Sequence, residues 1–233
     1  MKNFSHPPTP PRAEGTGMSH VKKLSYILIA IVFYMLGYAI IQSMVHVGKF
    51  DFYTQLDSLI PLVPEFIWIY HSVIPILFIT MVVLVRDKNL FFSMFWSCLV
   101  SSIILNLSYA LLPSFYPREN FALNTIHDYL LQFTRELDGA HNTFPSGHVT
   151  FSWLITLTAL KTRQVAANRS LCLIYIFWAI CVTLSTLTLK QHFIVDTLSG
   201  FFLSCFVFYS VNHLMSSRLS LFTSDEVPHA RGQ

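Results

Sequence analysis

Residues 66–85 read FIWIYHSVIPILFITMVVLV, a stretch of 20 residues without Asp, Glu, Lys or Arg. A helix needs about 20 mostly apolar residues to cross the ~30 Å hydrocarbon core of a bilayer. Further charge-free runs of at least 20 residues lie at 24–48, 89–117, 139–160, 170–189 and 197–217. The sequence therefore predicts an all-α, polytopic membrane protein with six transmembrane helices.

The composition of the whole chain supports the membrane class. Of 233 residues, 53% are hydrophobic and only 12% are charged, and the mean hydropathy is +0.53. A soluble domain carries about 25% charged residues, so a soluble enzyme and a disordered protein are both excluded. The net charge of +3 is too small to indicate a nucleic-acid partner. The composition instead predicts the bilayer as the partner.

The basic residues are distributed unequally between the predicted loops. Eleven of the 15 Lys and Arg residues lie in the two ends of the chain and in the loops after the second and fourth spans. Because basic residues are retained on the cytoplasmic side, both termini are predicted to be cytoplasmic. The remaining loops then face the periplasm or exterior of an inner or plasma membrane, or the lumen of a eukaryotic organelle.

The predicted organisation has three parts. Residues 1–23 form a disordered cytoplasmic tail, because their Pro- and Gly-rich start cannot pack a core. Residues 24–214 form a six-helix membrane domain, and residues 215–233 form a second cytoplasmic tail. The spans are expected at about 24–47, 66–85, 90–112, 144–160, 170–189 and 193–214.

The longest connection between predicted spans is residues 113–147. Long ordered loops usually carry function. Within this connection, residues 120–137 place apolar side chains at the spacing of one helical face: Phe121, Ile126, Tyr129, Leu130, Phe133 and Leu137. This pattern predicts an amphipathic helix that lies on the outer surface.

One cluster of polar residues lies at the start of the sixth predicted span. It contains Lys190, Gln191, His192 and Asp196. His192 and Asp196 are four residues apart, so on a helix the carboxylate can accept a hydrogen bond from the imidazole. Such a carboxylate fixes the tautomer and raises the basicity of the ring, as a nucleophilic histidine requires. Asp196 is also an ionisable residue inside an apolar helix, and residues of this kind usually have a function.

A second cluster, Pro145-Ser146-Gly147-His148, lies at the start of the fourth predicted span. Free backbone N–H groups and the helix dipole favour an anion at such a position. Gly147 lets the anion approach the backbone closely. His148 follows directly and is placed to donate a proton.

The remaining histidines and the polar residues of the long loop are interpreted as structural and not as catalytic or metal-binding. A single His near the end of a span is more often a satisfied polar residue than a catalyst, and this applies to His46, His71 and His213. The loop residues between 127 and 141 lack a recognisable ligand set for a metal, and the chain has no Cys-x-x-Cys. No metal and no cofactor are therefore expected.

The two clusters resemble the second and third signature motifs of the type 2 phosphatidic acid phosphatase superfamily, P-S-G-H and S-R-x5-H-x3-D. The resemblance covers residues 24–214, and the six-helix layout of the family matches the predicted spans. The second motif is complete at residues 145–148. In the third motif Ser185, His192 and Asp196 match, but Thr186 stands at the arginine position.

The first signature motif, K-x6-R-P, is degraded. Arg118 fits the arginine, but Leu111 stands at the lysine position and Glu119 at the proline position. These departures resemble the inositol phosphorylceramide synthase-like branch, as does the Asp-x-x-Ile-Pro-x-x-Pro pattern of residues 57–64. In that interpretation Lys190 replaces the missing charge of the third motif, as a point charge and not as a bidentate fork.

The resemblance implies catalysis through a phosphohistidine. His192, oriented by Asp196, attacks phosphorus, and His148 protonates the leaving alkoxide and then activates the acceptor. Charged and polar groups stabilise the phosphoryl oxygens in the transition state. The residues implied for this phosphate-binding set are Arg118, Lys190 and the backbone of Ser146 and Gly147, with Ser185 and Thr186 as further candidates.

The acceptor decides between two enzyme classes. Water would make the protein a lipid phosphate phosphatase-like hydrolase, which the intact second motif favours. An alcohol would make it a phosphotransferase of the inositol phosphorylceramide synthase type, which Thr186 and Lys190 favour. A non-catalytic protein that binds lipid phosphate is a third interpretation, although it would need neither histidine. A transporter is disfavoured because no proton relay lies deeper in the bundle. For the enzymes, the expected partner is a phospholipid or lipid phosphate.

Overall fold

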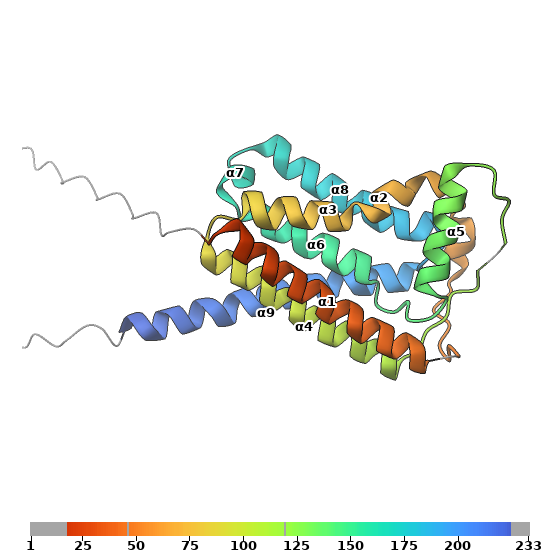
Figure 1. Cartoon of the computed structure of the whole chain (residues 1–233), viewed down its shortest axis with the longest axis horizontal. Helices are drawn as coiled ribbons and strands as arrows, with labels where there is room; N and C mark the ends of the chain where they lie inside the picture. The colour runs from red at the N-terminus through yellow and green to blue at the C-terminus, as the bar shows by residue number, and fades with distance from the viewer. Residues whose placement is uncertain (1–17, 46, 119, 225–233) are drawn as a thin grey trace, which may run out of the picture.

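The computed structural model describes residues 18–45, 47–118 and 120–224. Over these residues the chain is helical, as predicted, and its β-structure is confined to two isolated bridges. Figure 1 shows a bundle of long helices with α6 inside it. The long elements are α1 (His20–Met44), α4 (Lys88–Leu111), α6 (Gly147–Leu160), α8 (Arg169–Thr188) and α9 (Ile194–Ser224).

Five helical segments are long and apolar enough to cross a bilayer: His20–Met44, Pro64–Leu84, Lys88–Leu111, Arg169–Thr188 and Ile194–Ser217. They correspond to five of the six predicted spans. The other predicted span, 144–160, contains α6, which has only 14 residues. At 1.5 Å per residue α6 is about 21 Å long, shorter than the ~30 Å hydrocarbon core. The sixth crossing and the cytoplasmic termini stay predictions.

The second span is irregular. It comprises a 3-10 turn η2 (Pro64–Phe66), α2 (Ile67–His71), α3 (Val73–Phe78) and the π-helical η3 (Ile79–Leu84). Ser72 separates α2 from α3 and lies three residues before Pro75, which lacks the N–H that a continuous helix needs. The Ser72 hydroxyl accepts a hydrogen bond from Trp178 Nε1 at 2.8 Å, which joins this interruption to α8.

The helical region extends beyond both ends of the predicted membrane domain. α1 begins at His20 and not at 24, because Ser19 caps it by accepting the backbone N–H of Lys22. Lys23 is buried, and its Nζ donates to the carbonyls of Val82 and Val85 at the end of η3. At the other end, α9 continues to Ser224. The outer parts of the predicted tails, 1–17 and 225–233, lie outside the described residues.

The predicted amphipathic helix forms as α5 (Ile126–Asp138). In Figure 1 α5 crosses the end of the bundle opposite to the start of α1 and the end of α9. Leu131 on its inner side is fully buried in a cluster with Ile67 and Tyr70. Ile126, Tyr129, Phe133 and Leu137 on its outer side are more than half exposed. The long loop is thus an ordered cover over one end of the bundle.

Close packing joins the starts of α6 and α9. A Cβ atom on Gly200 would lie 2.6 Å from the carbonyl oxygen of Ser146. The hydroxyl of Thr150 donates to that same carbonyl at 2.8 Å and is 3.2 Å from the carbonyl of Gly200. The absence of a side chain at residue 200 therefore lets the two predicted motifs meet at this end of the bundle.

Shorter elements complete the described chain. A 3-10 helix, η1 (Gln55–Leu59), follows α1, and α7 (Arg163–Ala166) joins α6 to α8. Thr54 and Asp57 form a capping box at the start of η1. Asp57 is nevertheless buried, because the same side chain reaches the start of α9.

Candidate active site

His192 lies in the turn before α9 and is 7% exposed. Its Nδ1 is 2.9 Å from the carbonyl oxygen of Thr143 and 3.6 Å from Asp196 Oδ2. Because a carbonyl can only accept a hydrogen bond, Nδ1 carries a proton, and in the neutral ring the lone pair is then on Nε2. His192 also lines a cavity at this end of the bundle. The geometry thus leaves the second ring nitrogen free to act as a nucleophile.

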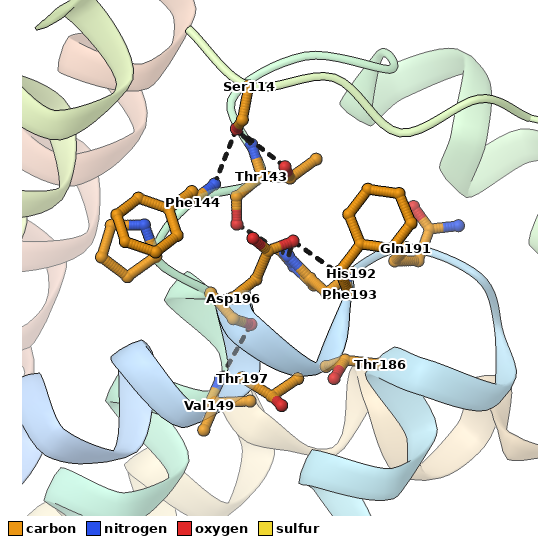
Figure 2. A network of polar contacts seen from close by, with 12 residues as sticks. Ser114, Thr143, Phe144, Val149, Thr186, Gln191, His192, Phe193, Asp196 and Thr197 are labelled. Atoms are coloured by element: carbon orange, nitrogen blue, oxygen red, sulfur yellow. Dashed lines mark hydrogen bonds and ion pairs between the residues drawn. The ribbon is translucent and has the colours of Figure 1, made fainter. Parts of the chain in front are cut away.

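Asp196 supports His192 differently from the prediction. We expected its carboxylate to accept the imidazole hydrogen bond, but the carbonyl of Thr143 does so (Figure 2). Asp196 Oδ2 instead accepts the backbone N–H of Phe193 at 2.9 Å and so caps the first turn of α9. Its carbonyl accepts the N–H of Ser146 at 3.0 Å. The fully buried carboxylate lies close enough to act on His192 by its charge.

Ser114 fixes the carbonyl that orients His192. It follows α4, and its Oγ accepts the backbone N–H groups of Thr143 at 3.0 Å and Phe144 at 2.9 Å. The hydroxyls of Ser114 and Thr143 are also hydrogen-bonded, at 2.8 Å. Figure 2 shows this chain of contacts from Ser114 through Thr143 to His192. Sequence reasoning missed Ser114, because no motif distinguishes it from other loop serines.

The second motif forms the start of α6. Ser146 is the N-cap, and its Oγ accepts the N–H of Val149. A Cβ on Gly147 would lie 2.6 Å from the hydroxyl of Tyr34 and 3.3 Å from that of Tyr109. A larger residue at position 147 would therefore clash with the hydroxyl groups of Tyr34 and Tyr109, which lie close to the start of α6. Gly147 lines the cavity, so the positive end of the α6 dipole faces it.

His148, the second residue of α6, lines the same cavity as Gly147 and His192. Its ring stacks on Tyr70, with ring centroids 3.7 Å apart and an interplanar angle of 22°. The Tyr70 hydroxyl donates to Asp138 Oδ2 at 3.4 Å. Asp138 Oδ1 accepts a shorter hydrogen bond, 2.6 Å, from Tyr38. The predicted proton donor and the predicted nucleophile therefore border one cavity.

Arg118 supplies the positive charge of the cavity. Its Nη atoms donate to the carbonyls of Arg135 and Gly139 at the end of α5, and to Gln191 Oε1 at 3.0 Å. Burial lowers the pKa of the guanidinium, and the carboxylate of Asp138 opposes this shift. A guanidinium is so basic that it is not deprotonated in proteins, so Arg118 stays charged at neutral pH. Among the described residues that line the cavity, Arg118 is the only Lys or Arg.

Four of the predicted phosphate-binding residues are not among those that line this cavity: Ser146, Lys190, Ser185 and Thr186. Lys190 has a positive φ of 54°, and its Nζ donates to the carbonyl of Asp57 at 3.0 Å. Ser185 and Thr186 are fully buried, and each hydroxyl donates to a carbonyl three residues earlier in α8. Thr186, which stands at the arginine position of the third motif, is therefore buried between helices and does not line the cavity.

Asp57 reaches the site from far away in the sequence. Its Oδ1 accepts the backbone N–H of Ile194 at 2.9 Å, across 137 residues, and so caps α9. Its Oδ2 accepts the N–H and hydroxyl of Thr54. Asp57 begins the 57–64 pattern seen in the sequence. The 57–64 pattern therefore pointed to Asp57, whose hydrogen bond with Ile194 positions the helix that carries His192 and Asp196 of the third motif.

The cavity is small, with a volume of about 70 Å³, and both polar and apolar atoms line it. Asn142 has a φ of 65°, is 3% exposed, and has no hydrogen-bond partner for either side-chain atom within the described chain. No single-residue signal in the sequence would have identified it. The lining residues are Tyr34, Met35, Tyr38, Tyr109, Arg118, Asp138, Gly139, His141, Asn142, Thr143, Gly147, His148, Gln191 and His192.

The described residues contain no group of three His, Cys, Asp or Glu side chains that could hold a metal ion. His127 instead contacts the ring of Trp68 at a ring-centroid distance of 6.2 Å. Asp128 accepts hydrogen bonds from Thr125 as part of the α5 capping box. These two loop residues thus serve local packing and capping.

The family of the chain follows from a comparison with known families. The family model of the PAP2 superfamily matches residues 86–220, which include α4, α6, α8 and the cavity residues His148 and His192. The chain therefore belongs to the PAP2 superfamily, whose members are phosphatases or phosphotransferases. Together with the apolar helices, this membership defines a membrane phosphatase-like protein. No curated protein matches the chain.

Proposed function

We propose that the protein is a membrane-embedded enzyme that cleaves a phosphoester of a lipid headgroup through a phosphohistidine at His192. The observation that carries this proposal is the hydrogen bond from His192 Nδ1 to the Thr143 carbonyl. It leaves Nε2 unprotonated at a cavity shared with His148 and Arg118. A lipid phosphate that only bound here would need neither of the two imidazoles.

In the first step, His192 Nε2 attacks phosphorus and an N–P bond forms. The bond between phosphorus and the leaving oxygen breaks, and the leaving alkoxide takes a proton from His148. In the second step, the hydroxyl of the acceptor attacks phosphorus and gives its proton to His148. The N–P bond breaks, and its electron pair returns to Nε2, so both histidines regain their starting states.

The negative charge of the phosphoryl oxygens is stabilised from two sides. Arg118 contributes a full positive charge that its hydrogen bonds hold in place. The N-terminus of α6 at Gly147 contributes free N–H groups and the dipole of a 14-residue helix. Donors fixed before the reaction need no reorganisation in the transition state. Ser146 acts in this proposal by capping α6, which holds those N–H groups in position.

The charge of the cavity favours a phosphodiester over a phosphomonoester. The carboxylate of Asp138 opposes the single guanidinium of Arg118. A phosphomonoester carries a charge of about −1.5 to −2 at neutral pH, whereas a phosphodiester carries −1. The weaker charge suits a site with one cation. A phosphodiester substrate also fits the phosphotransferase alternative, in which a phospho-headgroup moves to an alcohol as in the inositol phosphorylceramide synthase-like branch.

Lys190 stays a proposed phosphate ligand in that branch, although its Nζ contacts the Asp57 carbonyl in this conformation. Replacing it tests both roles. If Lys190 contacts phosphate, Lys190→Ala should lower the affinity for vanadate, which mimics the pentavalent transition state. If it only supports Asp57, the variant should lose thermal stability and keep its vanadate affinity.

The substrate reaches this site from the bilayer in our proposal. The cavity lies at the end of the bundle that α5 covers, where the spans would meet the headgroup region (Figure 1). Exposed Ile126, Tyr129 and Phe133 give α5 an outer face suited to the interface between headgroups and acyl chains. By the distribution of basic residues, we propose that this end faces the periplasm, exterior or lumen.

The test uses purified protein in detergent and phospholipids labelled with ³²P in the headgroup phosphate. Wild-type protein should release or transfer the labelled headgroup, and acid-labile, alkali-stable label should appear on the chain. His192→Ala should abolish both, and Ser43→Ala, an exposed serine on α1, should abolish neither. Label transfer that needs inositol or another alcohol would identify a phosphotransferase. Turnover unchanged in His192→Ala would contradict the mechanism, and no turnover with any lipid would favour a non-catalytic protein.

A further inference from the structure

Lys23 is a buried cation that the carboxylates of the described chain leave unpaired. The residue is 4% exposed and lies in the first turn of α1, at the end of the bundle opposite to α5 (Figure 1). Its Nζ donates to the carbonyls of Val82 and Val85, where η3 ends. The carbonyls at a helix C-terminus carry about half a negative charge between them. A buried charge needs fuller compensation than this, so a further negative group is missing beside Lys23.

A second cation, Arg86, adds to the excess of positive charge at this position. Arg86 is exposed and lies close enough for its charge to act on Lys23. No described carboxylate forms an ion pair with either residue. The neighbouring carboxylate of Asp87 accepts the N–H of Leu90 at 2.7 Å and so caps α4. The two cations therefore define a position for an anion, which exposed Arg86 can contact while buried Lys23 attracts it by its charge.

An apolar cavity lies between α1, η3 and α4 beside these charges. Ile27, one helical turn after Lys23, lines the cavity together with Met81 and Phe95. The cavity exposes only apolar atoms, and its volume of about 20 Å³ has room for a group the size of a methyl. Leu28, 53% exposed, continues the apolar surface along α1. A hydrocarbon chain can therefore lie along α1 and place one of its carbons in the cavity.

We propose that Arg86, Lys23 and this cavity bind an anionic phospholipid from the leaflet at this end of the bundle. The lipid phosphate contacts Arg86, and an acyl chain lies against Ile27 and Phe95. A free phosphate ion would leave the cavity empty, and a zwitterionic lipid would bring a further cation to the two already present. The residues of this site do not line the cavity of the two histidines, so the lipid is bound without reacting.

The bound lipid would stabilise the packing of α1. Among the five long apolar segments of the described chain, α1 has the smallest buried share, 11%. A lipid that contacts both Arg86, which precedes α4, and the apolar side of α1 joins the two helices. The proposal thus assigns an anionic lipid a structural role that is independent of the proposed catalytic mechanism.

The test measures lipid binding to the full-length protein in detergent by native mass spectrometry. The probes are phosphatidylglycerol and phosphatidylcholine with identical acyl chains, and all proteins carry His192→Ala so that turnover does not consume them. Phosphatidylglycerol should bind about fivefold more tightly or better. Arg86→Gln removes an exposed charge and should weaken phosphatidylglycerol binding about fivefold, with little effect on phosphatidylcholine. Ala30→Leu, which fills the apolar cavity, should weaken the binding of both lipids.

Arg169→Gln is the matched control, because this exposed arginine at the start of α8 lines neither cavity. It should bind both lipids as the parent protein does. Equal affinity of the parent for the two lipids would overturn the proposal. Equal losses in Arg86→Gln and Arg169→Gln would also overturn it, since they would show a diffuse attraction between anionic lipid and basic residues. Unchanged binding in Ala30→Leu, or displacement of phosphatidylglycerol by inorganic phosphate, would contradict the assignment of a lipid with its chain in the cavity.

Discussion

The ring of Tyr70 stacks on the imidazole of His148 at a ring-centroid distance of 3.7 Å, and its hydroxyl donates to Asp138. Tyr70 belongs to α2, which lies outside the residues 86–220 that match the PAP2 superfamily. A residue of the second span therefore positions the proposed proton donor. Tyr70 can therefore act on His148 through its stacked ring or through its hydroxyl, and different substitutions test the two.

Tyr70→Ala should lower kcat about tenfold or more, because His148 loses the ring that holds it and general acid catalysis contributes about 10²–10⁴-fold. Tyr70→Phe keeps the stacked ring and should retain kcat within about threefold. The measurement is the pH profile of kcat for both variants. A positioning role predicts that Tyr70→Ala changes the limb of the profile that reports His148. Equal losses in the two variants would show that the hydroxyl, and not the ring, carries the effect.

Ser114→Ala should reduce turnover without abolishing substrate binding. The variant leaves two backbone N–H groups, of Thr143 and Phe144, without their acceptor. The Thr143 carbonyl that orients His192 should then shift, and small misplacements of a reacting group can cost about 100-fold in rate. We expect kcat to fall by about tenfold to 100-fold while KM changes less. Ser25→Ala, on the exposed face of α1, serves as the control.

Gly200→Ala should both destabilise the protein and impair its activity. The added Cβ would lie 2.6 Å from the Ser146 carbonyl, which is backbone and cannot move aside cheaply. Overpacking of this kind costs about 1–3 kcal/mol, and α9 should separate from the start of α6. Thermal unfolding and turnover are measured together. Leu198→Ala, at a position that is 52% exposed on the same helix, should leave turnover unchanged. A fully active, stable Gly200→Ala would contradict the close packing.

The stability of α5 should depend on pH through Asp128. Hydrogen bonds from Thr125 hold the pKa of the Asp128 carboxyl below its usual value. The stabilisation is therefore complete above the unfolded pKa of about 3.9 and is lost as the pH falls through the lower folded pKa. Asp128→Asn should speed amide exchange in α5 near neutral pH, and the difference from wild type should narrow towards about pH 3. Glu136→Gln, an exposed position, should show no such trend.

The sequence was sufficient to predict the helical class and the central pair of histidines. Charge-free runs predict spans because a bilayer excludes charge, and five of those runs form long apolar helices. His148 and His192 were predicted from local motifs, and the packing of α9 on α6 brings both to one cavity. The period of residues 120–137 likewise predicted α5, because an amphipathic helix shows its apolar face directly in the sequence.

The rest depended on contacts between distant residues. The direction of Lys190 could not be predicted, since it is set by a positive φ and by an acceptor, Asp57, that is 133 residues away. Ser114 has no local pattern, because its contacts with Thr143 and Phe144 arise where two loops meet. The length of α6 was overestimated, since a charge-free run does not reveal that its first residues form a turn capped by Ser146.

The hydrogen bond between Asp57 and Ile194 bridges 137 residues and has a consequence for biosynthesis. The ribosome completes Asp57 long before it reaches α9, so the first loop has no partner at residue 194 while the intervening helices are made. Only when the last helix joins the bundle can Asp196, Asp57 and Ser146 take their final partners. Catalytic competence should therefore arise only after α9 has joined the bundle, and a chain that stalls before residue 194 should be inert.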